Sequence, residues 1–174
     1  MLDNLDGFLQ QQLEFRLQKA IADKMDEVIE KINNLSDKFS IGSEDKKSPF
    51  RNVLSTAVSA DTSIATITLF IQCQIGKSGA SPIWSKKIGN DIFAIELVEE
   101  LDILLECAEK IVESVRKSIP KNNPLNQYVD DPTNKKKLIK EIHLKLIQMY
   151  LGHLARKHTA LVGEASLNKS NSRN

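Results

Sequence analysis

The stretch DIFAIELVEELDILLECAEKIVESVRKS, residues 91–118, decides the fold. It contains neither glycine nor proline, and its leucine, isoleucine and valine side chains recur three and four positions apart. That spacing collects apolar side chains on one face of an α-helix, which Asn90 or Asp91 can cap at its start. Residues 133–161 show the same periodicity with a broader apolar arc. The sequence therefore predicts an all-α fold, a helical bundle of four to five helices.

The composition agrees with a helical bundle. Seven glycines and five prolines in 174 residues are too few for a loop-rich β-sandwich. A chain of this length buries roughly two-thirds of the surface that its unfolded form exposes, so it needs neither disulfides nor a metal to fold. The most apolar stretch, residues 64–75, is shorter than the roughly 20 residues that cross a bilayer. We expect a cytoplasmic protein that is not embedded in a membrane.

The first 40 residues form a segment of their own, predicted as one long amphipathic helix with heptad-like spacing from about Leu5 to Phe39. Asp3 or Asp6 can cap its start, and Gly42 can end it. Two interpretations of its apolar stripe stay open. The stripe packs on the chain's own core, or it forms a seam with another copy or a partner. The candidate interface residues are Ile21, Met25, Val28, Ile32 and Leu35.

The rest of the chain divides by composition. Residues 41–49 are polar and are expected to be a flexible, exposed linker. Residues 50–163 are expected to form the helical bundle, and residues 164–174 are expected to be a disordered tail. Within the bundle, residues 50–76 are rich in β-branched side chains, which also suits a strand. The length of their apolar face favours two helical pieces. Residues 119–132, rich in asparagine and proline, are expected to be a long loop.

Charge is distributed unevenly beneath the net value of +1. Residues 91–119 carry three basic and eight acidic side chains, whereas residues 135–163 carry seven basic side chains and one acidic one. On the predicted last helix, Lys137, Lys145 and Arg156 form a narrow stripe opposite the apolar arc. Two interpretations of this stripe stay open. Its lysines pair with the acidic helix 91–119, or they meet the phosphates of a nucleic acid.

A second basic region surrounds the loop after residue 76. Residues 62–90 contain no acidic side chain, and the loop holds the only tryptophan, Trp84. Two interpretations of this region stay open. Free loop amides, lysines and an aromatic ring can bind a nucleic-acid backbone. Alternatively, Trp84 is a core anchor and the lysines are solvated. The candidate RNA-binding residues of both regions are Arg51, Lys77, Lys86, Lys87, Lys137, Lys140, Lys145 and Arg156.

No set of residues predicts catalysis or a metal site. Gly76-Lys77-Ser78 resembles the end of a phosphate-binding P-loop, but Ile71 stands where the motif requires glycine. No two histidines are four residues apart, and the two cysteines, both in apolar segments, lack C-x-x-C spacing and are expected to be buried free thiols. We therefore expect no catalytic residue, no metal and no cofactor, and a protein that is not an enzyme.

The segment Phe70-Ile71-Gln72-Cys73-Gln74-Ile75-Gly76-Lys77, followed by Trp84, resembles the small subunits of type III CRISPR effector complexes, in which a helix ends in an F-I-x-x-Q-x-G-[KR] pattern before a loop and a tryptophan. The resemblance covers residues 50–162. It implies a small, all-helical, non-catalytic cytoplasmic protein that stacks in copies and contacts guide or target RNA through basic faces. Lys77 is the basic residue that matches the pattern.

Two functions follow as expectations. The first is an RNA-binding assembly subunit of a ribonucleoprotein, whose partners are RNA, other subunits of an effector complex and further copies of itself. The alternative is a helical interaction or scaffold protein that oligomerises through its N-terminal helix.

Overall fold

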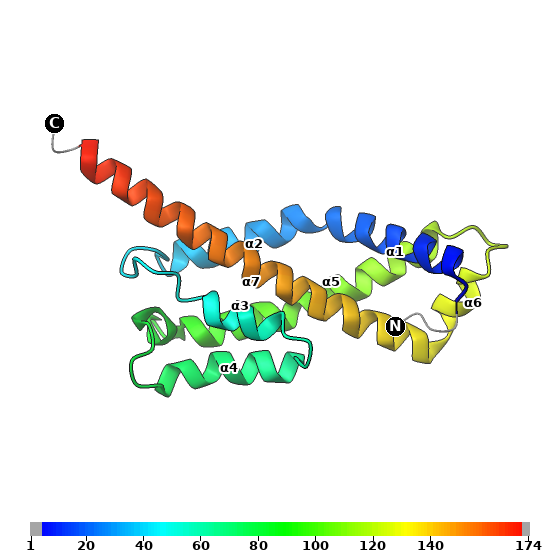
Figure 1. Ribbon diagram of the computed structural model, residues 1–174, viewed down its shortest axis with the longest axis horizontal. Helices are drawn as coiled ribbons and strands as arrows, with labels where there is room; N and C mark the ends of the chain where they lie inside the picture. The colour runs from blue at the N-terminus through cyan, green and yellow to red at the C-terminus, as the bar shows by residue number, and fades with distance from the viewer. Residues whose placement is uncertain (1–4, 172–174) are drawn as a thin grey trace. The chain divides into compact units, whose positions relative to one another are not determined.

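The computed structural model describes residues 5–171, and the predicted all-α fold is confirmed (Figure 1). Within these residues one short hairpin interrupts a succession of helices. The elements are α1 (Gly7–Ala22), α2 (Met25–Lys38), α3 (Arg51–Ala57), α4 (Ile64–Gly76), the 3₁₀ helix η1 (Pro82–Ser85), β1 (Lys87–Ile88), β2 (Asp91–Ile92), α5 (Phe93–Ser118), α6 (Leu125–Asp130) and α7 (Pro132–Asn171).

The chain folds into two compact units that its segments share. Unit 1 contains the described residues up to Glu27 together with Ile103–Leu146, and unit 2 contains Val28–Asp102 together with the described residues from Ile147 onward. Helices α2, α5 and α7 therefore each contribute residues to both units. The units do not follow the division expected from composition, because long helices cross from one unit to the other.

The expectation of one continuous N-terminal helix is wrong. Helix α1 ends at Ala22, α2 begins at Met25, and the amide of Lys24 turns back to donate to the carbonyl of Ile21 at 3.0 Å. The apolar steps before the break are four residues long, and each such step rotates the stripe by about 40° around a straight helix. The turn between α1 and α2 offsets this rotation, so the apolar side chains of both helices pack in the core. Asp6 caps α1 as predicted, accepting from the amides at positions 8 and 9, and Asp3 lies outside the described residues.

Residues 41–49 are not a flexible linker but an ordered turn region of unit 2. Helix α2 ends in a Schellman motif, in which the amide of Ile41 donates to the carbonyl of Ser36 at 3.0 Å and Ser40 takes a φ of +49°. Ser40, rather than the expected Gly42, therefore ends the helix. Ile41 is buried, and the carbonyl of Asp45 lies 3.0 Å from Nε2 of His158 on α7. These contacts fix the segment because it supplies apolar and polar groups to the core.

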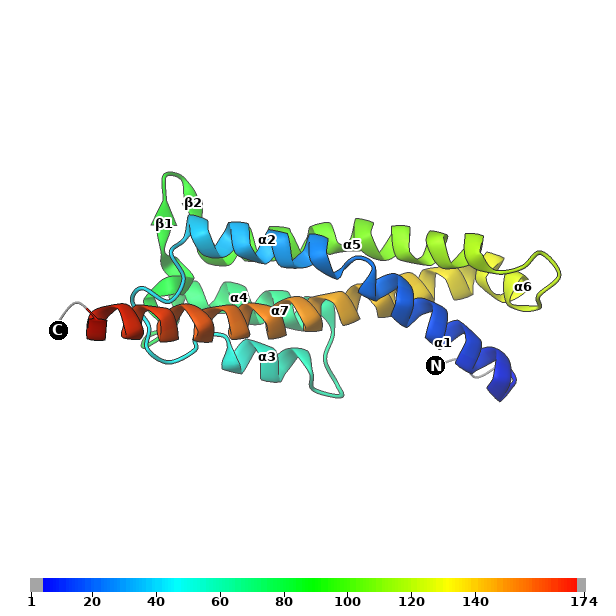
Figure 2. The ribbon, with the colours of Figure 1, turned by 90° about the horizontal axis from the view of Figure 1, so that it is seen from above.

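Helices α3 and α4 confirm the helical interpretation of residues 50–76, and they lie beside one another in unit 2 (Figure 1). Ser63 caps α4 by accepting from the amide of Thr66 at 3.1 Å. After η1 the chain makes the β1–β2 hairpin, with Gly89 at a φ of +62° in the two-residue turn (Figure 2). Glycine in the first central position is typical of a type II′ hairpin turn. The sequence interpretation missed this hairpin.

An aromatic cluster forms the core of unit 2. The ring of Phe93 lies 5.4 Å from that of Phe39, and 5.8 Å from those of Phe50 and Trp84. Offset and edge-to-face pairs at these distances each add about 0.5–1.5 kcal/mol beyond the burial of area. Trp84 is only 2% exposed. It is therefore a core anchor, as one of the two interpretations expected.

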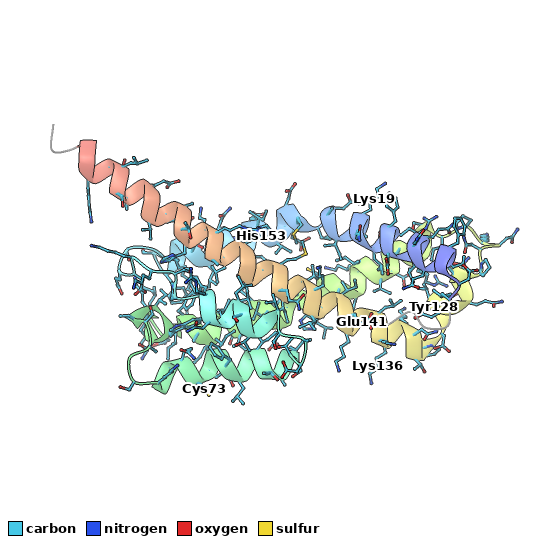
Figure 3. The ribbon with its side chains drawn as sticks, viewed as in Figure 1. Lys19, Cys73, Tyr128, Lys136, Glu141 and His153 are labelled. Atoms are coloured by element: carbon cyan, nitrogen blue, oxygen red, sulfur yellow. The ribbon has the colours of Figure 1, made fainter. Side chains whose placement is uncertain are left out.

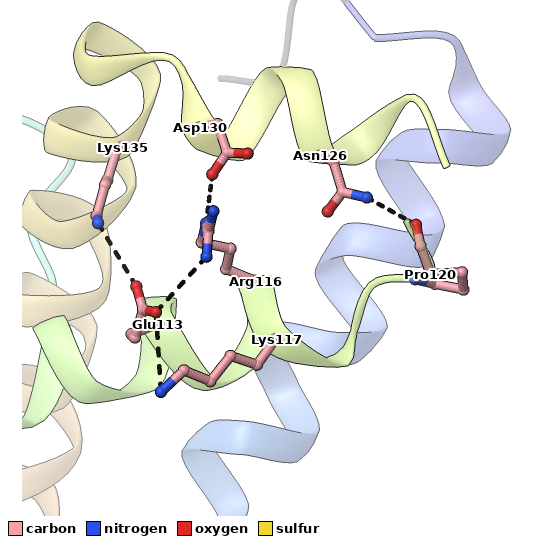
Figure 4. A network of polar contacts seen from close by, with 7 residues as sticks. All are labelled: Glu113, Arg116, Lys117, Pro120, Asn126, Asp130 and Lys135. Atoms are coloured by element: carbon pink, nitrogen blue, oxygen red, sulfur yellow. Dashed lines mark hydrogen bonds and ion pairs between the residues drawn. The ribbon is translucent and has the colours of Figure 1, made fainter. Parts of the chain in front are cut away.

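In unit 1 the chain turns from α5 into α7 through the short helix α6, where a plain loop was expected. Arg116 pairs with Asp130 of α6, and Glu113 pairs with Lys135 at the start of α7 at 3.6 Å (Figure 4). The Asp130 carboxylate raises the pKa of Arg116. Exposed ion pairs of this kind contribute at most about 1 kcal/mol each, so they orient the connection between α5 and α7 more than they stabilise it.

The expected disordered tail is wrong for residues 164–171, which continue α7. Glycine and proline are absent after Gly163, so no residue stops the helix, and the hydroxyl of Ser166 donates to the carbonyl of Val162 at 2.9 Å. The last part of this expectation, residues 172–174, lies outside the described residues.

Candidate nucleic-acid interface

A pocket of about 590 Å³ in unit 2 brings together residues from the turn region, α3, α4, the segment that follows α4, and α7. Lys47 and Arg51 come from the turn region and the first turn of α3, and Lys77 follows α4 directly. Polar lining residues are Ser48, Asn52, Gln74, Ser81 and Thr159. We call this site the basic pocket. None of the described residues that line it is acidic.

The three cations of the basic pocket are available to a ligand. Lys47, Arg51 and Lys77 are all exposed, and none of them has an ion pair within residues 5–171. Positive charges of one sign around a concave surface reinforce each other's potential and raise the local concentration of anions. Asn52 also lines the pocket, and its side-chain amide can donate hydrogen bonds to phosphate oxygens. The arrangement therefore suits a phosphate-bearing ligand.

The motif that carries the sequence resemblance lines this pocket. Phe70, Gln74 and Lys77 lie along one face of α4 and its end, and Trp84 follows in η1. Gln74 is 9% exposed and donates to the carbonyl of Phe70 at 3.2 Å, so it also secures the last turn of the helix. Because Trp84 is almost fully buried, it shapes the wall of the pocket and offers no free face on which a base could stack.

The other predicted cations of unit 2 are placed differently. Lys86 pairs with Glu44 at 3.1 Å and is half-buried, so its charge is largely compensated. Lys87 is exposed on β1. Arg156 is exposed on α7, where its Nη1 lies 3.5 Å from Nδ1 of His153. Of the predicted RNA-binding residues, the structure brings only Arg51 and Lys77 to the basic pocket, among the residues that it describes.

Lys137, Lys140 and Lys145 are exposed on the part of α7 that belongs to unit 1. One ion pair between α7 and the acidic helix joins Lys135 to Glu113 at 3.6 Å. Acidic side chains of α5 in unit 2 pair instead with α2, as Lys38 with Glu96 at 2.9 Å shows. A second such pair, Lys31 with Glu100, is 3.7 Å long. Two carboxylates of α5, those of Glu96 and Glu100, therefore pair with α2, and that of Glu113 pairs with α7.

The candidate interface residues lie in the chain's own core. Ile21, Val28 and Ile32 are each at most 7% exposed, Leu35 is 4% exposed, and Met25 is half-buried at the break between α1 and α2. A seam between copies through these side chains would require the fold to open. The burial favours the other interpretation, in which the stripe packs on its own chain.

Lys47 lines the basic pocket but was not predicted as a binding residue. The sequence offered little indication that Lys47 lines a binding site, because a lysine among glycine, serine and acidic residues is typical of a solvated linker. The pocket depends on the fold of that segment, in which Asp45 accepts a hydrogen bond from Ser81 next to η1. That long-range contact places Lys47 beside residues that follow it by about 30 positions.

His153 on α7, labelled in Figure 3, has a lowered pKa, first because burial disfavours the charged ring and second because Arg156 carries a like charge. Because arginine can only donate, the contact is a hydrogen bond in the tautomer of His153 whose Nδ1 carries no proton. We expect its titration, followed by NMR, to lie below the usual range for histidine, and Arg156→Gln to raise it. The pKa of His153 is lower in the folded state than in the unfolded state. The contribution of neutral His153 to the free energy of unfolding is therefore fully present above about pH 6.5, and it is lost as the pH falls toward the folded pKa. An unchanged pKa in the variant would contradict the contact.

Among the described residues, no cluster of histidine, cysteine, aspartate or glutamate side chains could hold a metal ion. Cys107 is buried as expected, whereas Cys73 is exposed on α4 (Figure 3). No helix in the described part of the chain has the length and apolar character to cross a membrane. Comparison with models of protein families, with curated proteins and with solved structures finds no match to this chain.

Proposed function

We propose that this protein is a cytoplasmic, non-catalytic RNA-binding subunit of a ribonucleoprotein, similar to the small subunits of type III CRISPR effector complexes. In this proposal it assembles in copies with other subunits and holds RNA phosphates in the basic pocket. The observation that carries the proposal is the convergence of Lys47, Arg51 and Lys77 on one concave surface without an acidic lining residue among those described.

The chemistry of the pocket favours a nucleic-acid backbone over a single small anion. A volume of about 590 Å³ exceeds what one phosphate needs, and its mouth is open to solvent. Uncharged polar side chains line the pocket together with the cations, and contacts of both kinds are typical of sites that hold a nucleic-acid backbone. The proposed binding is therefore independent of sequence and strongly dependent on salt.

The residues of the resemblance add a second line of support. Phe70, Gln74, Lys77 and Trp84 occupy separate positions of the motif, yet all of them line the basic pocket. A pattern that served the core alone would not need to end in an exposed lysine. In this proposal Gln74 and Trp84 shape the wall, and Lys77 contacts phosphate.

The test is the double variant Arg51→Glu/Lys77→Glu, measured against labelled single-stranded RNA at several salt concentrations. Each lost phosphate contact should reduce the slope of log K against log salt by about 0.7, so the pair should reduce it by about 1.4. The melting temperature should change little, because both positions are exposed. Retention of cellular RNA by the purified protein should fall in parallel.

The matched control is Lys110→Glu/Lys121→Glu, which makes the same change in net charge at exposed positions outside the pocket. It should leave the slope nearly unchanged if binding is local. Equal losses in both variants would mean that RNA responds to net charge alone. Full retention of RNA by the pocket variant would refute the proposal.

A further inference from the structure

Unit 1 contains a second concave surface, which the proposed function does not use. It is a groove of about 500 Å³ between α5 and the start of α7. Its floor includes the apolar side chains of Leu105, Pro132 and Ile139, and its α7 side carries Lys136 and Lys140. We call it the lysine-rimmed groove. Lys136 projects from this part of α7 in Figure 3.

Helical spacing explains how the groove combines apolar and basic character. Lys136 and Lys140 are four residues apart, so α7 presents a basic row, and Ile139 lies beside it on the same helix. His143 is buried deep in the floor. Leu105 of α5, which belongs to the floor, is 41% exposed, so its side chain is accessible to a ligand.

The charge of the groove is asymmetric. Neither Lys136 nor Lys140 has an ion pair among residues 5–171, whereas Lys135 is already matched by Glu113 at 3.6 Å. The opposite wall carries Glu109. A ligand with carboxylates along one side would gain from the lysine row, and repulsion from Glu109 would fix its orientation.

We propose that the lysine-rimmed groove binds an amphipathic helix of a partner protein, with apolar anchors on one face and carboxylates beside them. The apolar floor selects this partner over RNA, because a phosphate backbone would leave Leu105 and Ile139 without apolar contact. A helix that binds in an apolar groove inserts its side chains at positions i, i+3, i+4 and i+7. A groove between two helices, as here between α5 and α7, can accept such a row of side chains. The inference stands independently of the RNA proposal, since it uses a different unit and different residues.

The experiment measures fluorescence anisotropy of a fluorescein-labelled peptide with the full-length protein. The peptide is a helix with leucines at i, i+4 and i+7 and glutamates beside them. We expect saturable binding that Lys136→Glu/Lys140→Glu weakens by about tenfold or more. Leu105→Asp should weaken it as well, at an exposed position where folding tolerates the change. A peptide of the same composition, scrambled so that the leucines share no face, should not bind.

The Arg51→Glu/Lys77→Glu variant is the matched control and should bind the peptide as the unmodified protein does. Circular dichroism of each variant separates loss of binding from loss of fold. The inference is overturned if the peptide does not bind, or if it binds both double variants equally. It is also overturned if Lys136→Glu/Lys140→Glu instead abolishes RNA binding or self-association in sedimentation, because the groove would then serve RNA or a second copy.

Discussion

Replacing Phe93 by alanine should lower the free energy of unfolding by about 3–5 kcal/mol, the range for removal of a buried aromatic ring. Phe93 is fully buried at the first residue of α5 and contacts the rings of Phe39, Phe50 and Trp84. The substitution leaves a cavity bounded by three rings from separate segments, which cannot all move into it. Because a domain's total stability is about 5–15 kcal/mol, the variant should be marginally folded.

Urea denaturation followed by circular dichroism measures this loss, and the fluorescence of Trp84, the only tryptophan, reports on the cluster directly. The control is Phe15→Ala. Phe15 is 70% exposed on α1, so its removal should cost less than about 0.5 kcal/mol. A loss below about 1 kcal/mol for Phe93→Ala would mean that the four rings do not form one packed cluster.

The helical class was predictable because the apolar periodicity of α5 and α7 is strong and uninterrupted. The break between α1 and α2 was harder to predict. Asp23 and Lys24 are ordinary helix residues, and neither glycine nor proline marks the turn. The only trace was the change of apolar spacing after Ile21. Tertiary packing decided between a bend and a straight helix.

The hairpin could have been predicted. Gly89-Asn90 is a two-residue sequence typical of a tight hairpin turn, and isoleucines stand close on both sides. Interpreting Asn90 or Asp91 as the cap of α5 concealed it, because asparagine and aspartate favour both roles. The structure begins α5 at Phe93, after the second strand.

The candidate site was predictable in its parts but not in its assembly. Arg51 and Lys77 stood out by charge, yet they are 26 residues apart in sequence, and their proximity depends on the packing of α3 beside α4. Conversely, Lys137, Lys145 and Arg156 share one helix, but the sequence did not reveal that Lys145 belongs to unit 1 and Arg156 to unit 2. Charge patterns identify candidates, whereas long-range contacts determine which of them share a surface.

Replacing Gly42 by alanine should lower the free energy of unfolding by about 2–5 kcal/mol, a large effect for a single methyl group in a surface turn. Gly42 has a φ of +88°, where an L side chain costs about 1–2 kcal/mol. A Cβ at this position would also lie 3.1 Å from Cβ of Leu161 and 3.5 Å from the backbone nitrogen of Val162. The tight approach is the one to Cβ of Leu161, which is fixed to the backbone of α7, so relieving it requires a shift of that helix and overpacking adds about 1–3 kcal/mol.

Gly79→Ala separates the two contributions. Gly79 has a similar φ of +75°, but a Cβ there would meet no atom within 4 Å, so only the conformational cost of about 1–2 kcal/mol applies. The difference between the two variants, measured by urea denaturation, therefore reports the close packing of the turn region on α7. Equal losses would mean that residues 41–49 do not rest on that helix. Since Lys47 reaches the basic pocket only through the fold of this region, the same outcome would remove one cation from the proposed RNA site.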